Sequence, residues 1–220
     1  MIKVENIKTA GFESAIMASR NPMNSWNKSD SEFDVQTYWD DQNELEAEYY
    51  PVVMGDNDLD LLQRLYKAGV EHRTYARLIQ VWMDVTAPLY WWKEADRYTI
   101  GKSQVSTSTM HKIHSKEFTV DDFSCEHLTT YALNEFQGYL STMNFYRDKY
   151  LKSKNKEDWW QMIQMLPSSY NQKRTINMSY EVVFKMIKER TGHKLDEWND
   201  FVAILKDLPY VREIINEGGN

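Results

Sequence analysis

The sequence contains one cysteine, few glycines and prolines, and no long hydrophobic run. Among 220 residues there are 8 Gly, 5 Pro and a single Cys, Cys125. One cysteine excludes a disulfide framework within the chain and a zinc site built from four cysteines. No apolar segment approaches the ~20 residues that span a bilayer, and residues 1–15 lack the continuous apolar core of a signal peptide. We therefore expect a cytoplasmic protein without a membrane partner.

Positive charge is not in excess either. Lys and Arg number 26 against 33 Asp and Glu, which gives a net charge of −7 and a pI near 5.3. Binding along extended nucleic acid needs a basic face, so we expect no such partner. A small anionic ligand is compatible with this composition, because it needs only a local cluster of cations.

Hydrophobic side chains, by contrast, are plentiful. They make up 42% of the chain, and the aromatic residues include 8 Trp and 14 Tyr. A chain of this length and composition can bury a sizeable core, and we predict a single domain over residues 1–220. There are two adjacent pairs, Trp91-Trp92 and Trp159-Trp160. Adjacent side chains point in different directions, so we expect one ring of each pair in the core. The second ring either joins the core or is exposed as a stacking surface for a ligand.

The hydrophobic periodicity predicts an α+β chain with few strands and many helices. Alternating side chains predict strands over residues 2–7 and 75–86. Helical spacing with cap and stop signals predicts helices over residues 12–20, 58–68, 89–96, 121–146, 157–165, 177–190 and 195–205. Residues 33–50 permit a helix, and residues 101–110 are expected to form a Ser/Thr-rich loop.

A histidine and cysteine cluster is the first candidate site. His111 and His114, followed by Cys125 and His127, could supply tetrahedral metal ligands. Their spacing matches no established metal motif, so ordinary surface or half-buried residues around a loop are the favoured interpretation. We therefore predict no metal site.

Cations and hydroxyls gather in a second candidate segment. Lys93, Arg97 and Lys102 lie close in sequence to Ser103 and to the Ser-Thr-Ser-Thr run at 106–109. Such groups can hold a phosphate through charge-assisted hydrogen bonds. A polar surface loop after a buried strand accounts for the same residues equally well, and chemistry alone leaves both interpretations open.

This segment resembles the signature of the flavin-dependent thymidylate synthases. That signature reads Arg-His-Arg, two residues, Ser, one residue, Asn-Glu, one residue, Ser, one residue, Arg, and it follows a strand ending in Pro and an aromatic helix. LIQVWMDVTAP and LYWWKEAD precede the segment here. Arg97 falls on the first Arg if one residue is inserted before Ser103, and Ser103 and Ser108 fall on the two serines.

A second match lies further along the chain. The family has a Leu-Pro pair before a helix that starts with Asn and carries an Arg near its end. Here Leu166-Pro167 come first, and then Asn177, Phe184 and Lys188 fall on the family's Asn, a Phe, and the Arg that faces a nucleotide phosphate.

The chain also departs from the family pattern. Tyr98-Thr99 stand for His-Arg, Val105-Ser106 for Asn-Glu, Met110 for the final Arg, Glu94 for a Gln that faces the nucleotide, and Ser179 for another Arg. Each charge-assisted hydrogen bond contributes about 1.5–3 kcal/mol, so several uncompensated losses would weaken binding by powers of ten.

The resemblance implies a small antiparallel or mixed sheet with several long helices. Residues 111–158 look longer than the corresponding family segment, so we expect a helical elaboration there. It implies a homotetramer that uses FAD for the reductive methylation of a deoxyuridine monophosphate-type nucleotide, with NADPH and methylene-tetrahydrofolate as candidate co-substrates. It assigns Ser108 to catalysis beside the uracil ring, Arg97, Ser103 and Asn177 to the cofactor, and Lys93, Glu94, Ser108 and Lys188 to the substrate.

Two other hypotheses stay open. The first is a degenerate relative that binds a nucleotide or flavin without the methylation chemistry, as a binding or regulatory protein. The second is an unrelated α+β interaction protein whose serine-rich segment is only a surface loop.

Overall fold

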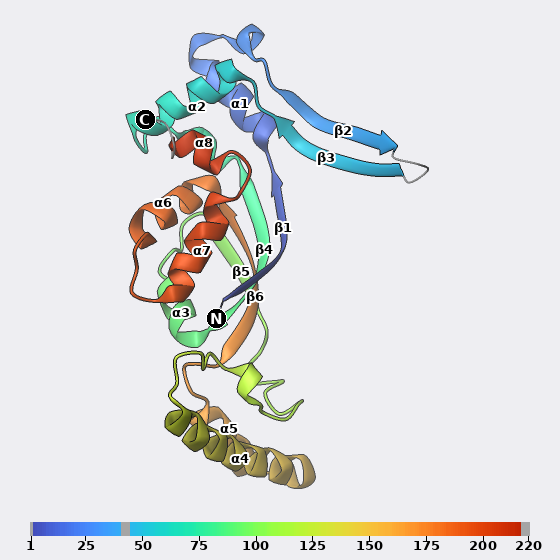
Figure 1. The fold of residues 1–220 in the computed structure, drawn as a ribbon, viewed down its shortest axis with the longest axis vertical. Helices are drawn as coiled ribbons and strands as arrows, with labels where there is room; N and C mark the ends of the chain where they lie inside the picture. Colours follow the sequence, from blue (N-terminus) through green and yellow to red (C-terminus); the bar gives the residue numbers. More distant parts are fainter. Residues whose placement is uncertain (1, 41–44, 217–220) are drawn as a thin grey trace.

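A four-stranded antiparallel sheet forms the centre of the molecule. The computed structural model describes residues 2–40 and 45–216, and its sheet has the order β1 (Lys3–Ala10), β4 (Gln80–Pro88), β6 (Asn171–Ser179) and β5 (Lys102–Ser106) (Figure 1). Every neighbouring pair is antiparallel. The predicted α+β fold with a small antiparallel sheet is therefore confirmed.

One face of this sheet is buried and the other is open. Along β4 the inward side chains Val81, Met83, Val85 and Ala87 are at most 1% exposed. The helices α3 (Leu89–Ala95), α6 (Tyr180–Arg190) and α7 (Asp196–Lys206) lie on this side (Figure 1). Both members of the pair Trp91-Trp92 are in the core, at 1% exposure each. The alternation of β4 thus sets which side of the sheet the helices cover.

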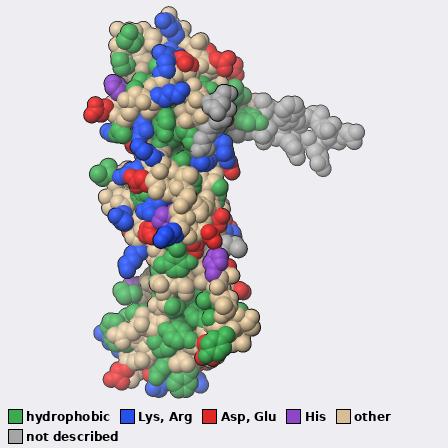
Figure 2. Space-filling view, turned by 60° about the vertical axis from the view of Figure 1, so that its left-hand side comes forward, with side chains coloured by type: hydrophobic (Ala, Val, Ile, Leu, Met, Phe, Trp, Pro, Cys, Tyr) green, Lys and Arg blue, Asp and Glu red, His purple; other side chains and the backbone are tan. Residues whose placement is uncertain are grey.

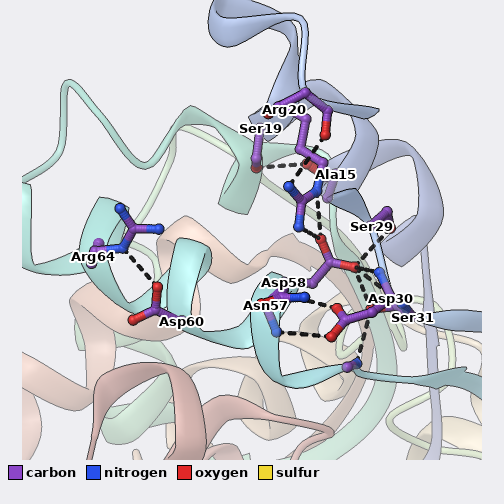
Figure 3. Close-up of polar contacts among 12 residues, drawn as sticks. Ala15, Ser19, Arg20, Ser29, Asp30, Ser31, Asn57, Asp58, Asp60 and Arg64 are labelled. Atoms are coloured by element: carbon purple, nitrogen blue, oxygen red, sulfur yellow. Dashed lines mark hydrogen bonds and ion pairs between the residues drawn. The ribbon is translucent and has the colours of Figure 1, made fainter. Parts of the chain in front are cut away.

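A buried ion pair ties the N-terminal segments together. Helix α1 (Phe12–Arg20) ends in Arg20, whose Nε donates to Asp58 of α2 (Asp56–Ala68) at 2.7 Å (Figure 3). Hydroxyls of Ser29 and Ser31 donate to the second carboxylate oxygen at 2.7 Å each. Between α1 and Ser29 lie the 3-10 turns Asn21–Met23 and Trp26–Lys28. This network gives an irregular segment a fixed place and satisfies a buried charge.

The expected helix over residues 33–50 is wrong. The structure has strands β2 (Glu32–Asp40) and β3 (Leu45–Val53) there, paired antiparallel and extending away from the sheet (Figure 1), while residues 41–44 lie outside the described part. The run FDVQTYW is rich in β-branched and aromatic residues, which favour extended backbone.

A helical lobe lies at the opposite end of the molecule. It consists of α4 (Thr130–Ser153) and α5 (Lys156–Met165), packed around a hydrophobic cluster of their own (Figure 1). Helix α4 begins nine residues later than the predicted start at 121, because residues Val120–Asp122 form a separate 3-10 turn. The Thr129 side chain caps α4 by accepting from the Ala132 N–H.

Three further predictions needed correction around the sheet. The expected loop 101–110 contains the edge strand β5, and the expected helix 177–190 begins only at Tyr180, after β6. The side chains of β5 are almost all exposed, so this strand carries no hydrophobic alternation. The strand expected over 75–86 begins at Gln80, after a 3-10 turn at Thr74–Arg77, and the C-terminal α8 (Val211–Ile215) had no prediction.

Candidate functional site

The two motif segments meet at a pocket beside the edge of the sheet. Ser103 of β5 pairs directly with Asn177 of β6, although they are 74 positions apart in the chain. The pocket, which we name the β5–β6 pocket, has a volume of about 460 Å³. Its lining comprises Arg77, Gln80, Thr99, Ile100, Gly101, Lys102, Ser103, Asn177, Ser179, Glu181 and Val182.

Asn177 is held in place by the sheet. Its Nδ2 donates to the Val81 carbonyl at 3.2 Å. Among the described residues no group donates to its amide oxygen, which leaves an acceptor at the pocket. Ser103 is exposed beside it. Two of the three predicted cofactor residues are thus together, and both present polar groups to one pocket.

Gly101 shapes the mouth of the β5–β6 pocket. Its φ of +77° is in the left-handed region, and an added Cβ would lie 3.1 Å from Ser179 Oγ and from Val182 Cγ2. Its carbonyl accepts from the Ser179 N–H at 3.0 Å. Only glycine combines this conformation with this close approach, which brings residues 99–101 against the start of α6.

The charged side chains around the β5–β6 pocket differ in whether they have partners within the chain. The Glu181 carboxylate is taken up by Arg73, with Nε–Oε2 at 2.8 Å and Nη2–Oε1 at 3.0 Å. The Lys102 Nζ donates to the Ala95 carbonyl at 2.7 Å, and burial lowers the pKa of this ammonium group. Within residues 2–40 and 45–216 the Arg77 guanidinium has neither an ion pair nor a hydrogen bond, so it is the open cation of the pocket.

The predicted residues of α3 and α6 lie elsewhere. Glu94 forms an ion pair with Arg190 at 2.6 Å and lies 3.4 Å from His193 Nε2. Lys93 and Arg97 are exposed on and just after α3. Lys188 is exposed on α6, about 10 Å along the helix from Glu181 at the pocket. Neither these three cations nor Glu94 lines the β5–β6 pocket.

Tyr98, which stands for the family's His, has a structural position. It is 5% exposed, its hydroxyl donates to Glu189 at 2.8 Å, and it accepts from Arg190 Nε at 2.9 Å. Burial raises the pKa of this phenol. Tyr98 therefore links the segment just after α3 to the C-terminal end of α6.

Ser108 lies in a separate pocket beyond the other end of β5. This Ser108 pocket has a volume of about 250 Å³ and includes the lysines Lys112, Lys116 and Lys173. Lys116 is paired with Asp122, and Lys173 lies 3.0 Å from Asp84. Ser108 Oγ is 2.9 Å from His111 Nδ1. The structure thus separates the predicted catalytic serine from Ser103 within one chain.

The histidine and cysteine cluster does not assemble. His127 lies 3.2 Å from Asp196, and Cys125 is a free, half-buried thiol whose pKa is raised by burial. Within the described ranges no group of three or more His, Cys, Asp or Glu side chains is placed to hold a metal ion. The same residues also contain no helix that is long and apolar enough to cross a membrane.

Sequence reasoning missed Arg77, Gly101 and Glu181 as pocket residues. Arg77 precedes β4, whereas Ser103 lies on β5. Both line one pocket because β6 pairs with β4 on one side and with β5 on the other. No local pattern marks such a residue. The one usable signal was at Gly101, since an isolated glycine before a polar run indicates a tight turn.

Comparison with solved structures finds this fold in flavin-dependent thymidylate synthases. The chain is similar to thymidylate synthase X (ThyX) from Helicobacter pylori with FAD and dUMP, with 15% identity, a TM-score of 0.66, and coverage of 99% of this chain and 98% of that chain. A second H. pylori ThyX structure, also complexed with FAD and dUMP, gives 14% identity, a TM-score of 0.63, and coverage of 98% and 97%. No protein-family model and no curated protein sequence matches. At such low identity the similarity shows a shared fold.

Proposed function

We propose that this chain is a divergent flavin-dependent thymidylate synthase-like protein. On this proposal it binds FAD and a deoxyuridine monophosphate-type nucleotide, and it methylates that nucleotide reductively with a methylene from tetrahydrofolate and NADPH as reductant. The observation that carries the proposal is the pairing of Ser103 with Asn177 at one pocket. A resemblance in two distant motifs predicted both residues, and the H. pylori structures with the same fold contain FAD and dUMP.

The donor set of the β5–β6 pocket fits the diphosphate of a flavin dinucleotide. Arg77 supplies an open cation, and Ser103 and Ser179 supply hydroxyls. Glu181 and Val182 belong to the first turn of α6, where backbone N–H groups lack intrahelical acceptors and favour an anion. A volume of about 460 Å³ suits a part of such a cofactor, with the remainder on the adjoining surface.

In this proposal the chain orients two ligands from the two ends of β5. The bound flavin supplies the hydride chemistry. Ser103, Asn177 and Arg77 hold the cofactor, while Ser108 and the lysines of its pocket hold the pyrimidine nucleotide. Arg97, Lys93 and Lys188 are exposed cations that could reach a ligand shared with a second subunit.

The alternative, a binding protein without methylation chemistry, has its own support. Glu94 and Tyr98 stand where the family has a nucleotide-facing Gln and a His, and both are engaged with Arg190. The ion pair occupies part of the hydrogen-bonding capacity of Glu94, and Tyr98 is buried, so both residues are less available to a substrate than the family's Gln and His. The two alternatives differ in turnover and share the prediction of ligand binding.

We also propose that the chain forms a homotetramer in the cytoplasm, as the resemblance implies. Hydrophobic side chains gather on the surface of the helical lobe, at the lower end of Figure 2. The exposed large ones of this lobe include Tyr131 at 75%, Phe145 at 62% and Trp160 at 41%. Contiguous exposed apolar surface is typical of a protein–protein interface.

The visible absorbance spectrum of the purified protein tests the cofactor. We expect a flavin spectrum, and release of FAD on denaturation. Asn177→Ala should reduce FAD affinity about tenfold, which corresponds to one hydrogen bond to a charged or polar ligand. Ser106→Ala is the control, because Ser106 lies on the neighbouring strand β5 and lines neither pocket. A colourless protein that takes up no added FAD would refute the redox function.

Turnover separates the two alternatives. Protein loaded with FAD is mixed with deoxyuridine monophosphate, methylene-tetrahydrofolate and NADPH, and the methylated nucleotide is measured. Product formation supports the enzyme. Tight binding of both ligands without product supports the binding protein.

A further inference from the structure

The helical lobe contains a pocket that neither motif accounts for. It lies between residues 110–114 and the α4–α5 turn, and its volume is about 330 Å³. Its lining comprises Met110, His111, His114, Tyr150, Lys154, Lys156 and Trp159. We name it the α4–α5 pocket.

Aromatic rings form the walls of the α4–α5 pocket. His114 and Tyr150 have ring centroids 5.0 Å apart at an interplanar angle of 72°. The Trp159 indole N–H donates to the Met110 carbonyl at 3.2 Å, which fixes that ring against residue 110. Flat walls of this kind favour a flat ligand, because ring–ring contact adds to the burial of apolar area.

Positive charge surrounds the same space. Lys154 and Lys156 line the pocket, and no Asp or Glu is among its described lining residues. Of the two acids in the first turn of α5, Asp158 is held by Lys149 at 2.9 Å and by Ser153, and Glu157 is exposed. Within the described residues neither ammonium group has an ion pair; the Lys154 Nζ lies 5.6 Å from the centre of the Tyr150 ring and the Lys156 Nζ lies 5.9 Å from that of Trp160. Ammonium groups without a carboxylate partner attract an anion.

His114 presents an unsatisfied polar atom. Within the described part of the chain its Nδ1 is buried and has no hydrogen-bond partner. Burial lowers the pKa of this imidazole, and Lys154, Lys112 and Arg147 lower it further. Because this nitrogen has almost no solvent-accessible area, it does not face the open space of the pocket, and the imidazole contributes its ring surface to the wall.

Lys154 has an unfavourable backbone conformation. It ends α4 with φ +55° and ψ +17°, in the left-handed region where helix ends usually have Gly or Asn. A lysine there is strained relative to glycine. Such strain is often found at functional sites, and here it places an ammonium group at the pocket.

We propose that the α4–α5 pocket binds a small flat anion, namely an aromatic ring bearing a phosphate or a carboxylate. The ring packs among Tyr150, His114 and Trp159, and the anionic group is held by Lys154 and Lys156. The volume is near the lower limit of ligand pockets, so a single ring with one anionic substituent fits and a dinucleotide does not. The site is independent of the proposed flavin function.

Calorimetry and NMR with phenyl phosphate test this site. Phenyl phosphate should bind with a Kd of about 1 mM or tighter and shift the His114 imidazole and Trp159 indole signals. Benzoate distinguishes a carboxylate from a phosphate ligand. Inorganic phosphate and phenol each lack one half of the recognition element, and each should bind at least about tenfold more weakly.

Variants locate the binding. Lys154→Gly removes the ammonium group and relieves the backbone, so it should weaken phenyl phosphate about tenfold while the melting temperature stays unchanged or rises. Lys156→Gln should weaken it similarly. Lys152→Gln, which changes an exposed lysine of α4 outside the pocket, should leave it unchanged.

Three results would overturn the proposal. The first is an absence of binding by both phenyl phosphate and benzoate. The second is binding without shifts at His114 and Trp159. The third is a loss in Lys152→Gln as large as that in Lys154→Gly, which would indicate a general charge effect.

Discussion

The β5–β6 pocket and the Glu94–Arg190 contact show two different outcomes for positions that the same family resemblance predicted. Ser103 and Asn177 present polar groups to a pocket, whereas Glu94 and Tyr98 bind Arg190 within the chain. The difference lies in whether another part of the chain packs against the residue. An edge strand leaves its side chains open, while α3 packs against the end of α6 and its polar residues acquire partners there. Sequence similarity to a signature therefore does not distinguish ligand contacts from structural ones.

Arg190→Ala should give the largest effect. Arg190 is 12% exposed, pairs with Glu94 and Tyr98, and lies 4.5 Å over the Trp198 ring. Its removal leaves the Glu94 carboxylate with the His193 contact alone and also removes the Tyr98 and Trp198 contacts, so we expect a loss of about 2 kcal/mol in the free energy of unfolding. Urea denaturation measures this loss. Lys188→Ala, an exposed residue of the same helix, should change stability by less than about 0.5 kcal/mol. Equal effects of the two variants would contradict a structural role for the Arg190 contacts.

The helices with strong periodicity were predictable from sequence, and the sheet edge was not. Helices α1, α5 and α7 match their predicted ranges to within a residue or so, because each has a regular apolar face and clear end signals. The strands β5 and β6 had weak local patterns, since β6 gains its place from pairing with β4 and β5 from pairing with β6. The hairpin β2–β3 was missed because its charged residues obscured its β-branched and aromatic ones.

The candidate site was predictable only in part. Ser103 and Asn177 were named from the resemblance, and the structure pairs them. Arg77 could not be found, because antiparallel pairing across three strands brings it to the pocket and no short motif encodes that. The Glu94–Arg190 pair spans 96 positions, so it could not be predicted from local sequence either.

Gly101→Ala tests whether the β5–β6 pocket depends on its glycine. The new Cβ would combine a φ of +77° with contacts of 3.1 Å, so we expect a loss of about 1–2 kcal/mol in stability and weaker FAD binding. Gly69→Ala is the control, since Gly69 has a φ of +110° and nothing within 4 Å. It should lose stability through backbone strain alone and keep its FAD affinity. Unchanged FAD affinity in Gly101→Ala would show that ligand does not occupy this pocket.

Glu94→Gln places the family's glutamine at position 94. It tests whether this position contacts the nucleotide or only Arg190. A glutamine keeps a hydrogen bond to Arg190 but loses the ion pair, so we expect a loss of about 1 kcal/mol in stability. Because the side chain stays with Arg190, affinity for deoxyuridine monophosphate should not rise. Calorimetric titration of both proteins measures this. A clear gain in affinity would show that position 94 faces the nucleotide and that the ion pair is readily exchanged for it.

Asp84 on the open sheet face gives the smallest effect and a test by pH. Hydrogen bonds from Thr175, Asn6 and Lys173 lower the pKa of this carboxylate to about 2. A pKa below that of the unfolded chain stabilises the fold above pH ~4, and that contribution is lost as the pH falls from 4 towards 2. Asp84→Asn should therefore show a shallower loss of melting temperature over this range. The same substitution leaves Lys173, which lines the Ser108 pocket, with only the Glu5 carboxylate at 3.9 Å, so anion affinity there should increase slightly. An identical acid profile in both proteins would show that other carboxylates govern the acid transition.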